Sequence, residues 1–252
     1  MRELANKVVV VTGGASGIGA ATTRAFAAAG AKVAFTYVTS GEDARAIEAD
    51  IVGAGGSARA IEADLTTAGG VDAAFAAATQ AFGPIDILFA NAGGLIQRSR
   101  CVDMDPDLFA RSVDLNLTST YLACQAALRI MEPRRTGAIV TMSSLAAFDG
   151  GGFGASHYAA MKGAIATYTR SLAKEVGPLG IRVNGVAPGL IATRFHDTFN
   201  TPEGRRSTVE KTPLRREGTP EDVAELVLFL ASERASFITG EIVHVNGGLG
   251  LF

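Results

Sequence analysis

The 252-residue sequence has no tryptophan, only two cysteines and no long run of apolar residues. Cys101 and Cys124 are too few for a disulfide framework, and neither has an activating neighbour in the sequence. The longest aliphatic runs, such as Val8–Val11, are far shorter than the ~18 residues that would span a bilayer. Because Glu3 lies near the start and no apolar stretch follows it, we expect no signal peptide and a cytoplasmic protein.

An excess of positive charge is also absent. The chain has 23 basic and 25 acidic residues, which argues against a nucleic-acid partner. Hydrophobic residues make up 48% of the chain and charged residues 19%, so we expect a packed core. His157, His196 and His244 are too scattered to predict a metal site. No linker divides the sequence, and its length suits one domain over residues 1–252.

Short apolar segments alternate with alanine-rich helical patterns along the whole chain. Several of the apolar segments have no polar face, as expected of parallel strands covered by helices on both sides. The alternation predicts an α/β fold with a doubly wound, parallel seven-stranded sheet and helices on both faces. The expected strands are Lys7–Thr12, Ala31–Tyr37, Ala58–Glu62, Ile85–Ala90, Ala138–Ser143, Ile181–Ala187 and Glu241–Val245, and the expected helices are Gly17–Ala29, Gly41–Gly53, Val71–Phe82, Pro106–Met131, Tyr158–Val176 and Pro220–Ser232.

A glycine-rich turn joins the first expected strand to the first expected helix. Gly13, Gly17 and Gly19 lie in the segment TGGASGIG, which also holds Ser16 and Ile18. Glycines allow a tight turn and a close backbone approach, and the N-terminus of the helix offers free N–H groups to a diphosphate. An ordinary glycine-rich turn is the alternative, but the placement between strand and helix favours a dinucleotide site.

The end of the second strand bears on which dinucleotide binds. In this fold class an acid at that position bonds the ribose hydroxyls of NAD. Here the sequence after the strand is Val38-Thr39-Ser40, and the first acids are Glu42 and Asp43. Thr39 and Ser40 could donate hydrogen bonds to a 2′-phosphate, which favours NADP(H). No arginine stands in this loop, so NAD(H) stays possible.

Tyr158 and Lys162 are four residues apart at the start of an expected helix and therefore share one face. A nearby cation would lower the pKa of the phenol from about 10 towards a range useful for acid–base chemistry. Ser144 follows the fifth strand, at the sheet edge where a substrate would bind, and its hydroxyl could hold a carbonyl oxygen. A surface Tyr–Lys pair and a polar turn are the alternatives.

These motifs together resemble those of the short-chain dehydrogenase/reductase family, in its branch of about 250 residues. The resemblance covers nearly the whole chain and implies a Rossmann-type fold. It implies that Asn116, Ser144, Tyr158 and Lys162 form the catalytic tetrad. For the cofactor it implies contacts from the glycine loop, from the catalytic Tyr158 and Lys162, and from residues at or after the ends of the other strands. The last group is Tyr37, Thr39, Ser40, Asp64, Leu65, Asn91, Ala92, Gly93, Pro188, Gly189, Ile191 and Thr193.

The resemblance also implies a mechanism and an assembly. Tyr158 would exchange a proton with the substrate oxygen, Lys162 would lower the pKa of Tyr158 and bond the nicotinamide ribose, and Asn116 would anchor a relay water. A homotetramer is expected, with a homodimer second. Two departures are relevant: Ser16 stands where many NADPH-dependent members have Arg or Lys, and Ser143 is an alternative to Ser144.

The substrate is expected to be a small carbonyl or alcohol compound. Residues 190–214 read as a substrate lid, because 191–211 form one long excursion after a strand. Arg98, Arg100, Arg194, Arg205 and Arg206 could bind an acidic or polyhydroxylated substrate, or could be solvated loop charges. The strand-two ending TYVTS favours a 3-oxoacyl thioester reductase, whereas the arginines fit a sugar or polyol dehydrogenase equally well. A catalytically silent dinucleotide sensor is the alternative from a different class.

Overall fold

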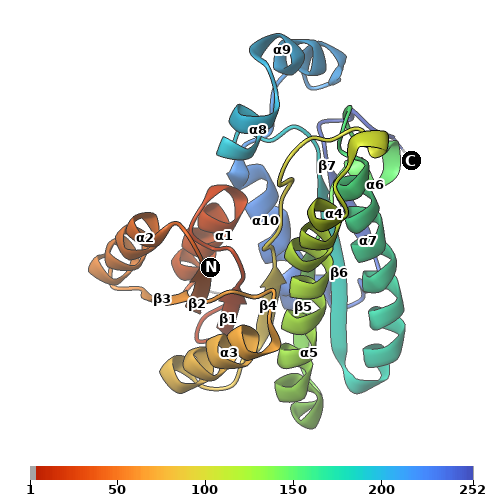
Figure 1. The fold of residues 1–252 in the computed structure, drawn as a ribbon. Helices are drawn as coiled ribbons and strands as arrows, with labels where there is room; N and C mark the ends of the chain where they lie inside the picture. The colour runs from red at the N-terminus through yellow and green to blue at the C-terminus, as the bar shows by residue number, and fades with distance from the viewer. Residues whose placement is uncertain (1–3, 252) are drawn as a thin grey trace.

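The computed structural model describes residues 4–251 and contains one seven-stranded sheet in the order β3-β2-β1-β4-β5-β6-β7 (Figure 1). Every neighbouring pair of strands is parallel. The strand order reverses between β1 and β4, and a ligand crevice forms at such a reversal, beyond the carboxyl ends of the strands. The strands are β1 (Val8–Val11), β2 (Lys32–Tyr37), β3 (Ser57–Glu62), β4 (Ile87–Ala90), β5 (Gly137–Met142), β6 (Ile181–Pro188) and β7 (Ile242–Val245).

Helices cover both faces of the sheet, as the alternating sequence pattern predicts. Side chains of β1 alternate between the two sides: Val9 and Val11 pack into one core cluster, and Val8 and Val10 pack into the other. The first cluster includes residues of α1 (Gly17–Ala28), α2 (Gly41–Gly53) and α10 (Pro220–Ala231). The second includes residues of α3 (Ala68–Phe82), α5 (Ser119–Met131) and α7 (Ser156–Val176). The predicted doubly wound fold is confirmed.

The helix expected over Pro106–Met131 is interrupted. It consists of α4 (Pro106–Val113), a single π-helical turn at Asp114–Thr118 and α5. Such a turn widens the helix by one residue and often occurs at a functional position. The sequence pattern did not indicate the interruption, because the apolar periodicity continues through it.

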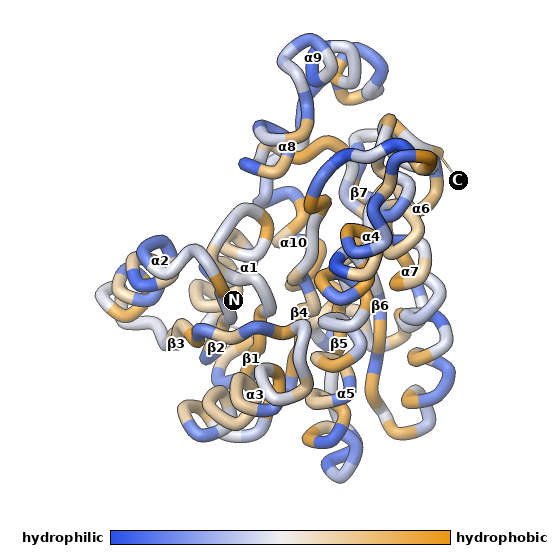
Figure 2. Tube along the Cα trace, viewed as in Figure 1, coloured by the Kyte–Doolittle hydropathy of each residue, from blue (hydrophilic) through white to orange (hydrophobic). Residues whose placement is uncertain are grey.

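Three short helices lie in segments expected to be loops. They are α6 (Ala146–Asp149), α8 (Arg194–Phe199) and α9 (Pro202–Lys211). Thr201 caps α9 by accepting a hydrogen bond from the Gly204 N–H, and Pro202 occupies the first turn. Figure 1 shows α8 and α9 projecting beyond the helix-covered sheet, and no residue of either helix is buried. In Figure 2 the chain at α9 is largely hydrophilic.

None of the helices in residues 4–251 combines the length and apolar character needed to span a membrane.

Candidate active site

The glycine loop brings the backbone of Gly13 against the start of α1. A Cβ on Gly19 would lie 2.1 Å from the carbonyl oxygen of Gly13, so only glycine fits. Gly13 and Gly17 have φ values of 63° and 50°, in the left-handed region that favours glycine. No side chain caps the first turn of α1, and no acid lies in that turn. Its N–H groups can therefore receive an anionic group of a ligand.

Thr12 ties this loop to the residues after β4. Its hydroxyl accepts hydrogen bonds of 2.9 Å from the backbone N–H groups of Asn91 and Ala92. The Asn91 side-chain amide donates in return to the carbonyl oxygens of Thr12 (2.9 Å) and Gly13 (3.1 Å). The sequence analysis named Asn91 but missed Thr12, whose signal is a hydroxyl at the last position before the glycine turn.

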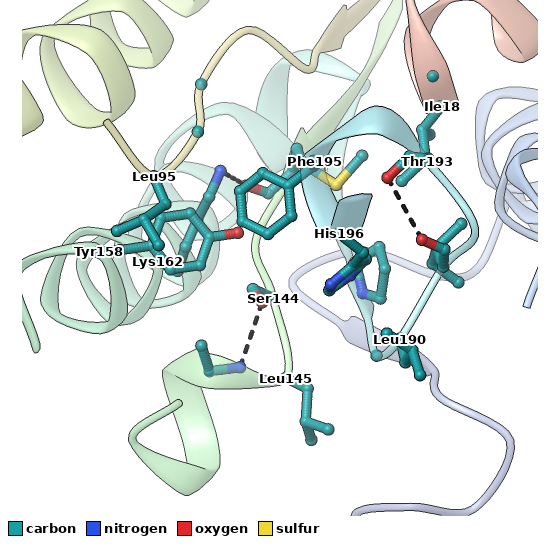
Figure 3. A pocket seen from close by; sticks show the side chains of 18 of the residues that line it. Ile18, Leu95, Ser144, Leu145, Tyr158, Lys162, Leu190, Thr193, Phe195 and His196 are labelled. Carbon is teal, nitrogen blue, oxygen red and sulfur yellow. Dashed lines mark hydrogen bonds between the residues drawn. The ribbon is translucent and has the colours of Figure 1, made fainter. Parts of the chain in front are cut away.

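Tyr158 and Lys162 lie on the same face of α7 and line one cavity together with Ser144 (Figure 3). The cavity has a volume of about 540 Å³ and also reaches the glycine loop. The Lys162 Nζ atom is 5.6 Å from the centre of the Tyr158 ring and donates a 2.8 Å hydrogen bond to the Met142 carbonyl. The expected common face of Tyr158 and Lys162 is therefore present.

The two adjacent serines face different surroundings. Ser143 also borders the cavity, but it is buried and its hydroxyl donates to the Lys162 carbonyl at 2.9 Å. Ser144 lines the cavity, forms a side-chain hydrogen bond with Tyr158, and accepts a 3.2 Å hydrogen bond from the Ala146 N–H. Ser144 is thus the serine that can reach a substrate oxygen beside Tyr158.

The ionisation of Tyr158 differs from the expectation. Burial raises the pKa of Tyr158, and the hydrogen bond with Ser144 opposes this only in part. Burial also lowers the pKa of Lys162 to about 7. Because burial dominates, the net shift of the Tyr158 pKa is upward, opposite to the lowering expected from Lys162. In this structure Tyr158 is a neutral phenol at neutral pH.

Asn116 lies in the π turn and does not line the cavity. Its side-chain amide donates to the carbonyl oxygens of Gly94 and Ser112, both at 3.0 Å, and its Oδ1 accepts from the Gly94 N–H at 2.9 Å. A Cβ on Gly93 would lie 2.7 Å from Asn116 Oδ1 and 3.3 Å from Lys162 Nζ. Asn116 therefore holds the chain after β4 beside Lys162.

Most of the predicted cofactor residues share the cavity, and a minority lie outside it. Asp64 Oδ1 is held by Thr66, through the N–H at 2.9 Å and the hydroxyl at 2.7 Å, and these bonds lower the Asp64 pKa. The cavity is lined by Gly13, Ser16, Gly17, Ile18, Gly19, Ser40, Asn91, Ala92, Gly93, Pro188, Gly189, Ile191 and Thr193, while Tyr37, Thr39, Asp64 and Leu65 do not line it.

Aromatic side chains of α8 form a wall that the sequence analysis missed. Figure 3 shows the Phe195 ring beside the Tyr158 ring. The Phe195 ring centroid is 5.8 Å from that of Tyr158 and 5.1 Å from that of Phe199. His196 packs against Phe195 and also lines the cavity. Burial is the main cause of a lowered His196 pKa. No periodic pattern marks Phe195, because α8 is too short to show one.

Four of the five loop arginines are paired with acids. Arg100 pairs with Asp103, Arg194 with Asp43, Arg205 with Asp197 and Glu217, and Arg206 with Glu203. Arg98 instead donates to backbone carbonyl oxygens, and both Arg98 and Arg194 line the cavity. The interpretation of these arginines as loop charges therefore fits four of them.

The other residues that the sequence analysis considered are ordinary in their surroundings. His244 packs edge-on against Phe148, with 4.5 Å between ring centroids. Cys124 is buried, which raises its pKa to about 12, so its thiol is unreactive at neutral pH. In residues 4–251 no group of three or more His, Cys, Asp or Glu side chains could hold a metal ion.

Comparison with known proteins places this site in a family. The family model described as enoyl-(acyl carrier protein) reductase matches residues 13–250. A 3-oxoacyl-(acyl-carrier-protein) reductase of Aquifex aeolicus is 40% identical over 98% of each chain. A glucose and ribitol dehydrogenase homolog of Oryza sativa subsp. japonica is 38% identical over 98% of this chain and 87% of its own.

Solved structures agree with this placement. A structure of 7α-hydroxysteroid dehydrogenase complexed with NADH and 7-oxo glycochenodeoxycholic acid superimposes with a TM-score of 0.93. It is 35% identical and covers 97% of this chain and 94% of its own. A Serratia marcescens short-chain dehydrogenase/reductase mutant has a TM-score of 0.91 at 33% identity, covering 98% of this chain and 99% of its own.

The chain belongs to the short-chain dehydrogenase/reductase family. It is an oxidoreductase that acts on CH–OH groups with NAD(P) as the acceptor. The structure fits such a cofactor independently of the family: the glycine loop lines the cavity, and the uncapped N-terminus of α1 offers backbone N–H groups there to a diphosphate.

Proposed function

We propose that the protein interconverts a ketone and a secondary alcohol by NAD(P)(H)-linked hydride transfer, with Tyr158 as the acid–base group. One observation carries the proposal: Tyr158, Ser144 and Lys162 share a single cavity with the uncapped glycine loop. The cofactor would supply the hydride chemistry, and the protein would supply position and proton transfer.

The ionisation of Tyr158 favours carbonyl reduction at neutral pH. Because burial raises the pKa of Tyr158, the phenol keeps its proton and can donate it to a developing alkoxide. Ser144 is placed to hold the same oxygen, since its hydroxyl bonds to Tyr158. In this proposal Lys162 bonds the nicotinamide ribose, and Asn116 keeps Gly93 and Gly94 beside Lys162 and anchors a relay water.

NADP(H) is the cofactor we propose, with NAD(H) as the alternative. No carboxylate precedes Glu42 after β2, and the nearby Asp43 is paired with Arg194 at 3.1 Å. Arg45 also folds back towards the start of α2, where its Nη1 atom lies 3.4 Å from the Cβ position of Gly41. The positive charges of both arginines lower the local negative charge where a 2′-phosphate would bind. Thr39 and Ser40 would donate hydrogen bonds to that phosphate.

For the substrate we propose a 3-oxoacyl thioester, the class named for the 40% identical relative. A sugar or sugar-acid carbonyl is the second candidate, favoured by the rice glucose and ribitol dehydrogenase homolog. A third reading, a catalytically silent dinucleotide sensor, is disfavoured because Tyr158, Ser144 and Lys162 are all present in the cavity.

The test combines binding and turnover. NADPH and NADH are titrated separately by nicotinamide fluorescence, which no tryptophan obscures. Ten-fold tighter NADPH binding corresponds to about 1.4 kcal/mol of 2′-phosphate recognition. Turnover is then measured with acetoacetyl-coenzyme A and with a panel of sugars and sugar acids. Cofactor binding without turnover of any of them would favour the sensor, and absence of cofactor binding would contradict all three readings.

Two further features belong to the same proposal. Residues 190–214 act as a substrate lid, since α8 covers Tyr158 while α8 and α9 contribute no buried residue. The chain assembles as a homotetramer, with a homodimer second, because apolar side chains of α4 and α5, including Phe109 and Tyr121, stay more than two-fifths exposed. A monomeric mass in light scattering at micromolar concentration would contradict both assemblies.

A further inference from the structure

We propose that Arg98 is a positioning residue for the reaction: its guanidinium joins the two segments that enclose the substrate end of the cavity and holds the α8 aromatic wall against Tyr158. The two segments are the glycine-rich loop after α6 and helix α8. Arg98 itself comes from a third segment, the chain after β4, and is half-buried. The inference rests on the proposed role of Tyr158.

The contacts of Arg98 reach both segments at once. Its Nε–H donates to the Phe199 carbonyl at 3.0 Å, and an Nη1–H donates to the Phe153 carbonyl at 2.6 Å. Phe199 is the last residue of α8, and its carbonyl cannot be satisfied within the helix. A cation at this end also faces the negative end of the helix backbone. The guanidinium therefore replaces the missing helical partner and fixes the end of α8.

The glycine-rich loop after α6 is shaped to receive this side chain. A Cβ on Gly152 would lie 3.2 Å from Arg98 Nη1, and a Cβ on Gly154 would lie 3.2 Å from the Arg98 Cβ atom. The backbone adds a 2.9 Å hydrogen bond from the Ser99 N–H to the Gly154 carbonyl. This loop has the sequence DGGGFG (149–154), which the catalytic proposal leaves unexplained, and its glycines form the surface that allows Arg98 to approach.

Phe199 links α8 to Tyr158, the proposed acid–base group, through ring packing. Its ring packs on Phe195, and Phe195 packs on Tyr158, with centroid separations of 5.1 Å and 5.8 Å. This stack packs on the Tyr158 side chain, and burial is the main cause of the raised pKa of the phenol. When Arg98 no longer holds the Phe199 carbonyl, we expect α8 to open more often and Tyr158 to ionise at lower pH.

The chain provides a matched control two residues away. Arg100 is exposed and pairs only with Asp103, at 3.7 Å, on the same segment. Arg98→Ala and Arg100→Ala each remove one positive charge from the same loop, but only Arg98→Ala removes the bridge. Arg98→Lys keeps the charge without the planar fork of donors, so it separates charge from geometry.

The first measurement is chymotryptic cleavage of the cofactor-free, full-length protein, with products identified by mass. Cleavage after Phe195 and Phe199 reports the opening of α8, and cleavage after the fully exposed Phe237 is the internal reference. In Arg98→Ala we expect α8 cleavage to be about ten-fold faster with Phe237 unchanged. Arg98→Lys should lie between Arg98→Ala and the wild type, and Arg100→Ala should match the wild type.

The second measurement is the pH profile of kcat/KM for reduction of acetoacetyl-coenzyme A with NADPH. The rate should fall at high pH as Tyr158 loses its proton, and Arg98→Ala should move that fall to lower pH. Partial restoration by Arg98→Lys is expected.

Three outcomes would overturn the inference. They are unchanged α8 cleavage in Arg98→Ala, an equal rise at Phe237 (which would mean that Arg98 supports the whole fold), and an unshifted pH profile despite faster cleavage. Because the cleavage assay needs neither cofactor nor substrate, an inactive wild-type enzyme would contradict the proposed function and leave the α8 result standing.

Discussion

The two ends of the cavity are built in different ways. At the cofactor end, the glycine loop and the chain after β4 are held together by the side chains of Thr12 and Asn91 on backbone groups, and Gly19 lies where its backbone meets the Gly13 carbonyl. At the substrate end, α8 and α9 have no buried residue and are held by arginines that bridge to carbonyls and carboxylates. The backbone packing at the cofactor end leaves almost no space for an added side-chain atom. The substrate end depends on side-chain bridges whose carbonyl or carboxylate partners can be exchanged for others.

This difference separates what the family shares from what an individual member recognises. A backbone cradle can bind the diphosphate common to both cofactors, because every contact is made by groups that all residues have. A layer held by side-chain bridges can change its lining without disturbing the sheet beneath it.

Tyr158 lies where the cofactor end and the substrate end of the cavity meet. Its replacement should therefore distinguish most clearly between loss of turnover and loss of cofactor binding. Tyr158→Phe removes the proton donor and leaves the ring that packs on Phe195. We expect kcat to fall by about 10³-fold or more, while the Kd of NADPH measured by fluorescence stays within about two-fold. Tyr121→Phe, a change at a half-exposed tyrosine on α5, is the control and should keep full activity. Retention of a tenth of wild-type turnover in Tyr158→Phe would exclude Tyr158 as the acid–base group.

Adding one methyl group at the cofactor end should be far more damaging than adding it elsewhere. In Gly19→Ala the new Cβ would meet the Gly13 carbonyl at 2.1 Å, which forces the loop and α1 apart. We expect cofactor binding to weaken about ten-fold or more and the protein to lose about 1–3 kcal/mol of stability. The measurements are NADPH titration and urea unfolding.

Gly69→Ala is the matched change. Gly69 lies in α3, and a Cβ there would have no atom within 4 Å. Alanine should therefore stabilise the protein by about 0.4–1 kcal/mol without changing cofactor affinity. Equal effects of the two variants would mean that the Gly19–Gly13 approach is not what builds the site.

The same contrast explains which features the sequence predicted. The helix-covered parallel strands and the glycine loop follow from local rules: the all-apolar Val8–Val11, whose side chains alternate between the two core clusters, and glycines where φ is positive at Gly13 and Gly17. The common face of Tyr158 and Lys162 follows from helical spacing alone. These are properties of neighbouring residues, so the sequence carries them directly.

Features that depend on distant partners were missed for a physical reason. Phe195 packs on Tyr158 from a helix whose last carbonyl, that of Phe199, is bonded by Arg98, about a hundred positions earlier in the chain. The raised pKa of Tyr158 has the same origin, since the sequence displays the nearby Lys162 but not the burial of both groups. The Thr201–Pro202 cap of α9 was readable from its residue types and was overlooked.

Acid should weaken the fold through its three histidines. Burial lowers the pKa values of His157, His196 and His244, so the unfolded chain takes up protons at a higher pH than the folded chain. Stability is therefore greatest above the ordinary histidine pKa of 6.5 and is lost as the pH falls below it. We expect a melting temperature at pH 5.5 that is lower than at pH 7.5 by on the order of 2–4 °C. His157→Gln, at the most buried of the three, should reduce this difference, and an undiminished difference would exclude His157 as a contributor.

The smallest expected effects are those of replacing Arg205 and Arg206, two neighbouring arginines of α9. Arg205 bonds to Asp197 on α8 and, at 2.7 Å through Nε, to Glu217 before α10, whereas Arg206 pairs only with Glu203 within its own helix. Because only Arg205 links separate segments, Arg205→Ala should raise KM for the carbonyl substrate a few-fold while kcat changes less than two-fold. Its stability cost should be below about 1 kcal/mol, since the bridge is partly solvated and spans elements without a core.

Arg206→Ala should change neither quantity, because an exposed pair within one helix contributes only a few tenths of a kcal/mol. If KM rose equally in both variants, loss of positive charge rather than of the bridge would be responsible, and the substrate end would be tuned by its overall electrostatic field.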